Sequence, residues 1–72
     1  MPPPPADWTP HIGRKVTMRY RLDEPGGPHT ELLGVLQAVD SSQGDRILLK
    51  IMDKRGRTHL VAASEVVAAK VF

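Results

Sequence analysis

The sequence contains no cysteine among its 72 residues. Disulfide bonds, thiolate nucleophiles and thiolate metal ligands are therefore excluded. The sequence also has no apolar run near the roughly 18 residues of a membrane span, and its first residues lack the basic and apolar regions of a signal peptide. Because the absence of cysteine also fits a reducing compartment, we expect a cytoplasmic protein with no membrane partner.

Motifs of catalysis and cofactor binding are missing as well. The chain has no phosphate-binding G-x-x-x-x-G-K or G-x-G-x-x-G loop and no G-x-S-x-G nucleophile motif. The histidines His11, His29 and His59 lack the close spacing of zinc ligands, and we expect His59 to point outward from a strand. We therefore predict no catalytic residue, no metal site and no cofactor, and expect that the chain by itself is not an enzyme.

Length and composition predict one small domain. Apolar residues make up 40% of the sequence and charged residues 25%, which is ordinary for a folded chain. Residues 2–5 are all proline and favour an extended polyproline II segment, so we expect a disordered proline-rich tail at residues 1–7 and a β domain at residues 8–72. Trp8 is expected to lie across one open end of the core and to precede a single helical turn at residues 9–12.

Residues 13–22 carry the clearest structural pattern in the chain. Apolar side chains occupy every second position from Val16 to Leu22, which is typical of a strand with one buried and one exposed face. A helix fits less well, because a period of about 3.6 residues would spread these side chains around its surface. We therefore predict the first strand here.

Turn-forming residues divide the rest of the chain into four more strands. The segment D-E-P-G-G-P-H and residues 40–45 are rich in turn formers, and residues 53–56 predict a tight hairpin turn. Gly34, inside the second strand, predicts a bend, a bulge or the close approach of another backbone. Residues 63–66 are too few for an α-helix and predict a 3-10 turn. The remaining predicted strands comprise residues 30–39, 46–52, 57–62 and 67–71.

An all-β fold follows from this pattern. Five short strands, with a 3-10 turn before the last, are the order of elements in a small SH3-like barrel. Closure of the barrel would pair strand edges that are rich in Val, Ile and Leu. The alternation patterns place nine residues in the predicted core: Val16, Met18, Tyr20, Leu36, Ile47, Leu49, Ile51, Leu60 and Val66.

Basic residues form the main electrostatic feature of a chain whose net charge is only +2. Alternate residues of a strand lie about 7 Å apart, close to the spacing of phosphates along nucleic acid. A solvated face is the competing interpretation and the one we favour, because proteins that bind single strands also use exposed aromatic residues, and the chain has only one Trp, one Tyr and one Phe. The candidates for binding nucleic acid or a partner are Lys15, Arg19 and Arg21 on the first strand, and Lys54, Arg55 and Arg57 at the last hairpin turn.

Three segments carry a resemblance to a known family: H-I-G-R-K-V-T-M-R-Y-R-L, E-L-L-G-V-L-Q-A-V-D and S-E-V-V-A-A-K-V. Together, over residues 8–71, they resemble the SH3-like domain at the N-terminus of a group of bacterial GNAT-family N-acetyltransferases, sometimes labelled histone acetyltransferase-like. The resemblance implies a non-catalytic accessory domain, with an acetyltransferase domain as its partner that carries the acetyl-CoA site. The glycine-containing loop that binds the cofactor pyrophosphate in such enzymes has no counterpart here, so no catalytic residue is transferred.

A second family of barrels remains an alternative. The segments G-V-L-Q-A-V-D and I-L-L-K-I resemble the Sm-like RNA-binding fold, in which a second strand bent at a glycine ends in an aspartate. The chain lacks the N-terminal helix and the late glycine-containing signature of that fold. A stand-alone Sm-like or SH3-like barrel that binds nucleic acid through its basic strand face is therefore ranked second.

Overall fold

The computed structural model describes residues 1–21 and 29–72, and for Gln43 only the backbone. Leu22, the last residue of the predicted first strand, and residues 23–28 of the predicted loop lie outside the described residues. Within the described part, the helices are 3-10 turns of three residues, and none is long enough to cross a membrane. The elements are η1 (Thr9–His11), β1 (Lys15–Arg21), β2 (His29–Gln43), β3 (Arg46–Met52), β4 (Thr58–Ala62), η2 (Ala63–Glu65) and β5 (Val66–Val71). The predicted all-β class, the five strands and the 3-10 turn before the last strand are confirmed.

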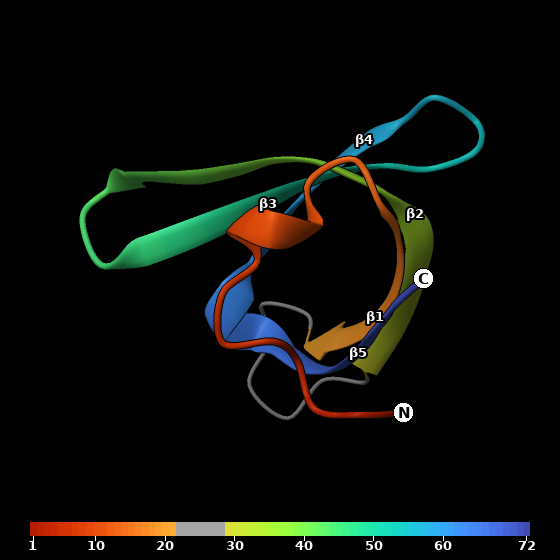
Figure 1. The fold of residues 1–72 in the computed structure, drawn as a ribbon, viewed down its shortest axis with the longest axis horizontal. Coiled ribbons are helices and arrows are strands. Elements are labelled where there is room, and N and C mark those ends of the chain that lie inside the picture. Colours follow the sequence, from red (N-terminus) through yellow and green to blue (C-terminus); the bar gives the residue numbers. More distant parts are fainter. Residues whose placement is uncertain (22–28) are drawn as a thin grey trace.

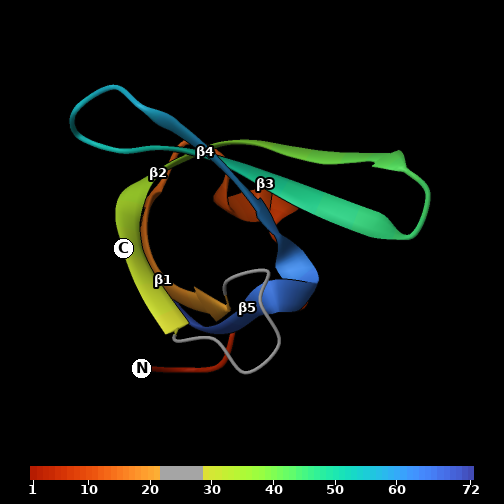
Figure 2. The same ribbon diagram turned by 180° about the vertical axis from the view of Figure 1, so that it is seen from behind.

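The five strands form one antiparallel sheet in the order β4-β3-β2-β1-β5. The sheet is strongly curved, and η2 joins its two edge strands (Figures 1 and 2). The long strand β2 pairs with β1 through its first half and with β3 through its second half. Since the pairings among the described residues include none between β4 and β5, closure into a barrel is not confirmed.

The core lies on the inner face of this curved sheet. Alternate residues of β1 and β3 point inward, as their period of two predicts. Tyr20 is half-buried and packs against this core, and Trp8 joins it from the segment before η1. Six of the nine predicted core residues are buried: Val16, Met18, Leu36, Leu49, Ile51 and Val66.

The predicted phase of β4 is wrong. Val61 pairs with Leu49 and is buried, whereas Leu60 pairs with the exposed Lys50 and is 67% exposed. His59, expected to point outward, pairs with Ile51 and is half-buried. Because Leu60 and Val61 are adjacent and both apolar, the pattern within the strand fits either phase, and the pairing with β3 selects one.

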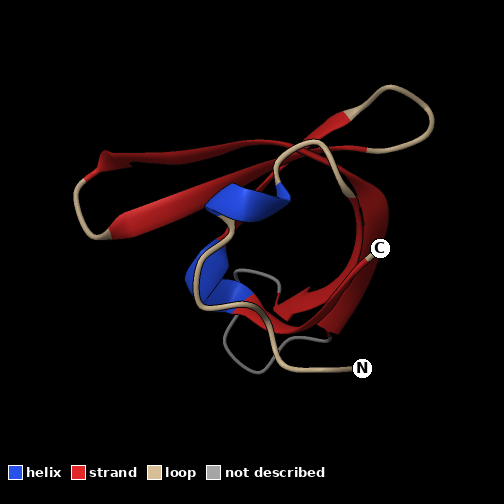
Figure 3. Cartoon of the chain, in the orientation of Figure 1, coloured by secondary structure: helices blue, strands red, loops and turns tan. Residues whose placement is uncertain are grey.

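The β2–β3 hairpin is longer than predicted. Residues 40–43 continue β2 instead of forming a turn, and only two residues separate the strands, with Gly44 at a φ of 71°. Asp40 Oδ1 accepts hydrogen bonds from the backbone N and Oγ of Ser42, at 2.9 and 2.6 Å, where the strand register shifts. Figure 3 shows this hairpin extending away from the rest of the sheet. Ile47 lies near its distal end and is therefore 39% exposed, contrary to the predicted burial.

The proline segment runs beside the edge strand β5. The backbone N–H of Ala69 donates to the carbonyl of Pro2 at 2.9 Å, and Pro4 and Pro5 are half-buried. Further along, Thr9 belongs to η1, and its backbone N–H donates to Asp7 Oδ1 at 3.0 Å. The short helical turn predicted here is thus present, whereas the disorder of residues 1–7 stays a prediction.

Candidate functional site

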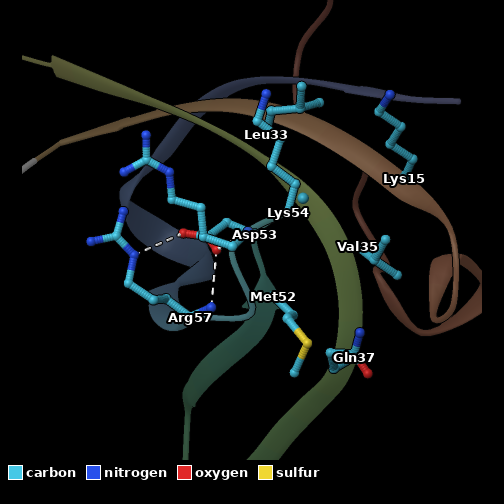
Figure 4. Close-up of a pocket in the computed structure, with 10 residues that line it drawn as sticks. Lys15, Leu33, Val35, Gln37, Met52, Asp53, Lys54 and Arg57 are labelled. Carbon is cyan, nitrogen blue, oxygen red and sulfur yellow. Dashed lines mark hydrogen bonds and ion pairs between the residues drawn. The ribbon is translucent and has the colours of Figure 1, made fainter.

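A groove on the outer face of the sheet is the candidate site. It lies where β1, β2 and β3 are neighbours, because Val35 of β2 pairs with Lys15 on one side and with Met52 on the other. These three residues form a row across the three strands. The turn between β3 and β4 borders the same groove (Figure 4).

Gly34 allows the strands to approach closely beneath this groove. A Cβ atom at this position would lie 2.5 Å from the carbonyl oxygen of Met52 and 2.8 Å from Cγ2 of Ile51. Both distances are far below van der Waals contact, and the nearer atom belongs to the backbone. The predicted requirement for glycine is therefore explained by close approach of the β3 backbone.

The floor of the groove is apolar and open. Leu33, Val35 and Met52 contribute their outward side chains, and Leu33 and Met52 are 48% and 37% exposed. The groove encloses about 370 Å³. Sequence reasoning missed Leu33 and Met52 as site residues, although each is an apolar residue on the outward phase of its strand, which was the available signal.

Asp53 organises the turn beside the groove. Its Oδ1 accepts the backbone N–H groups of Arg55 and Arg57 at 2.9 and 3.0 Å, and its Oδ2 lies 2.9 Å from His59 Nε2. The backbone of the turn closes with Asp53 N–H donating to the Arg57 carbonyl and Gly56 N–H donating to the Asp53 carbonyl. The hydrogen bond from His59, followed by the backbone hydrogen bond from Arg57, lowers the pKa of Asp53 to about 2. A charged carboxylate therefore holds the turn in shape.

Four of the six predicted basic residues line this one groove. Lys15 lies on the β1 side, and Lys54 and Arg57 lie on the side of the turn (Figure 4). Arg55, which belongs to the same turn, also lines the groove. Arg57 Nε is 3.5 Å from Asp53 Oδ2, whereas the ion pairs among the described residues involve neither Lys54 nor Arg55. The groove therefore has an apolar centre with positive charge at both ends.

The other two predicted basic residues lie elsewhere. Arg19 Nη2 is 2.7 Å from Glu31 Oε1, in an exposed ion pair between β1 and β2. Arg21, at the end of β1, is exposed and does not line the groove. Of the basic residues predicted along β1, Lys15 therefore lines the groove together with the second basic cluster, whereas Arg19 and Arg21 do not.

Phe72 is a further surface residue that sequence reasoning did not select as a site residue. It is 52% exposed, and its ring centroid lies 5.8 Å from Lys15 Nζ and 5.2 Å from Lys70 Nζ. Its backbone is fixed by a hydrogen bond from its N–H to the Lys15 carbonyl and by one from Arg14 Nε to its own carbonyl. Two ammonium groups thus flank an exposed aromatic ring next to the groove.

The histidines do not come together as a metal site. Across residues 1–21 and 29–72, no group of three or more His, Asp or Glu side chains is arranged to hold a metal ion. His59 is bonded to Asp53, and Nδ1 of His11 is buried without a hydrogen-bond partner. His11 and His59 do not line the groove.

Comparisons with protein-family models, with curated proteins and with solved structures find no significant match. The geometry of the groove therefore carries the functional interpretation, together with the resemblance noted in the sequence.

Proposed function

We propose that this chain is a non-catalytic interaction domain that binds a protein partner at the groove between β1, β2 and the β3–β4 turn. The observation that carries the proposal is the combination of an open apolar floor with cations at both ends. Apolar surface supplies binding energy when it is covered, and charged edges orient the partner. Exposed Leu33 and Met52 side chains at the centre of such a groove are typical of a surface that a partner covers.

The distribution of polar groups supports a non-catalytic role. Every buried side chain among the described residues is hydrophobic. Catalysis needs polar groups that converge in a desolvated pocket. Here the polar side chains of the described residues are exposed or half-buried.

The proposed partner is an acetyltransferase domain of the GNAT family, in the same polypeptide or in a separate one. The resemblance of residues 8–71 supports this choice, and the order of five strands with η2 before β5 agrees with the SH3-like architecture that it implies. The partner domain would carry the acetyl-CoA site, so this chain needs no cofactor of its own.

Titration of the chain with a GNAT-family acetyltransferase domain tests the proposal. We expect Leu33→Glu to weaken binding at least about tenfold, which corresponds to about 1.4 kcal/mol, because it places a carboxylate on the apolar floor. Leu60→Glu is the matched control, since Leu60 is also an exposed leucine but does not line the groove. Equal loss in both variants, or none in either, would remove the groove from the interface. Binding of acetyl-CoA by the chain alone, or acetyl transfer to amines, would overturn the non-catalytic assignment.

Nucleic-acid binding is the second candidate, and the specific observation for it is Phe72 between Lys15 and Lys70. An exposed ring with flanking cations can stack on a base while the cations contact phosphates. We would measure the anisotropy of labelled oligo-dT and oligo-U at low and moderate salt. Salt-sensitive binding that Phe72→Ala and Lys70→Glu weaken, and Arg21→Glu leaves intact, supports this candidate. Absence of binding at low salt excludes it.

A further inference from the structure

We infer that the groove binds an extended acidic peptide of the partner. In this peptide one apolar residue lies at the centre, with one acidic residue two positions before it and another two positions after it. This inference rests on the proposed function and specifies the partner's chemistry.

The floor selects an aliphatic anchor. The groove lining contains Leu33, Val35 and Met52 but no aromatic residue, so a nucleic-acid base inside the groove could not stack on a ring there. The volume of about 370 Å³ is near the lower end of pockets that bind small ligands, which run from about 300 to 1,000 Å³. A groove of that size holds one or two apolar side chains, with the peptide backbone at the opening.

The spacing selects the positions of the charges. Lys15 and Met52 flank Val35 on the neighbouring strands, so their backbones are two strand spacings apart, roughly 10 Å. The turn with Lys54 and Arg55 follows directly after Met52. Residues four apart in an extended peptide are separated by about 13 Å. A peptide that runs along this row can place its apolar residue over Val35. Acidic residues two positions before and after the apolar residue then lie near the cations at the two ends of the groove.

The charges select a polyanionic partner. Four cationic side chains line the groove, against the single carboxylate of Asp53. That carboxylate is already engaged by Arg55 N–H, Arg57 N–H and His59. Lys54 and Arg55 form no ion pair with a carboxylate among the described residues. Both side chains can therefore pair with carboxylates of the bound peptide. A basic or neutral peptide would leave these cations uncompensated.

The test uses a short fluorescein-labelled peptide with a central leucine and a glutamate two positions before and after it, separated by serines. Three control peptides replace the leucine by serine, replace both glutamates by lysine, or move the glutamates next to the leucine. We expect saturable binding of the first peptide, at least about tenfold weaker binding of the first two controls, and a smaller loss for the third. Binding should weaken as salt rises, because charge pairs contribute to it.

Variants of the chain locate the binding. Leu33→Glu should abolish binding of the leucine peptide, and Lys54→Glu with Arg55→Glu should weaken it at least about tenfold. Leu60→Glu and Arg21→Glu are the matched controls for an exposed leucine and an exposed arginine outside the groove, and they should bind as the wild type does. Circular dichroism of each variant verifies that the β fold is retained.

The outcomes separate this inference from the proposed function. If no acidic peptide binds, or if the serine and lysine controls bind equally well, the inferred partner class is wrong. The proposed function still stands in that case if Leu33→Glu weakens binding of the acetyltransferase domain. Preferential binding of oligo-dT through the same groove residues would instead overturn both the peptide and the protein-partner assignment.

Discussion

The two faces of this sheet use similar side chains for different purposes. Leu49, on the inner face of β3, is fully buried, whereas Leu33, on the outer face of β2, is 48% exposed. The buried side chains among the described residues are all hydrophobic, while the outer face combines exposed Leu33, Met52 and Leu60 with basic residues. Burial of apolar area stabilises the fold on one face, and the apolar area left uncovered on the other is available to a partner.

The largest expected effect is the loss of stability when the buried Leu49 is truncated, and the same truncation of Leu33 on the outer face is the comparison. Leu49→Ala should lower the free energy of unfolding by about 2 to 5 kcal/mol, because it leaves a cavity in the core. Leu33→Ala should cost less than about 1 kcal/mol, since half of that side chain is already in water. Urea unfolding followed by the fluorescence of buried Trp8 measures both. Similar values for the two variants would contradict the assignment of the faces.

A substitution at Gly34 tests the contact between β2 and β3 that lies beneath the groove. Gly34→Val should destabilise the fold by about 1 to 3 kcal/mol, because its Cβ would overlap the backbone carbonyl of Met52 and the strands must separate. Urea unfolding measures this loss of stability. Gly44→Ala is the control, because a Cβ atom at Gly44 would meet no neighbour, although the positive φ of Gly44 is unfavourable for alanine. A stability equal to that of the wild type would show that the strands do not approach this closely.

The smallest expected effect is a change in how stability depends on pH, and it arises from Asp53 in the turn on the outer face. The pKa of Asp53 is lowered from 3.8 to about 2, so the folded state favours the charged form. Its contribution to stability is complete above about pH 4 and is lost as the pH falls towards 2. Asp53→Asn should therefore flatten the decline of stability between pH 4 and pH 2 relative to the wild type.

The comparison of the two pH profiles isolates this group. Asp7 and Asp40 also have lowered pKa values, through hydrogen bonds from Thr9 and Ser42 respectively, but both remain in the variant. Their contributions cancel when one profile is subtracted from the other. Parallel profiles in this range would mean that Asp53 does not hold the turn as a carboxylate.

The grouping of the basic residues around the groove could not be predicted from the sequence. The sequence predicted six cations in two clusters, and the structure joins Lys15 to the cluster at the turn while Arg19 pairs with Glu31. Lys15 and Lys54 are distant in sequence, and both line the groove only because β2 pairs with β1 on one side and β3 on the other. A local pattern contains no information on such pairing.

The sequence by itself determined the all-β class, the bounds of β3 and the inner faces of β1 and β3, because alternation with a period of two is a local property. Only the tertiary structure decided the phase of β4, the exposure of Ile47 and the groove. Each of these depends on which residues of distant strands face each other. Val61 rather than Leu60 is buried because it pairs with Leu49. The register of such a pairing depends on the apolar surface that the whole sheet buries. Two adjacent apolar residues in one strand do not show which of them faces the core.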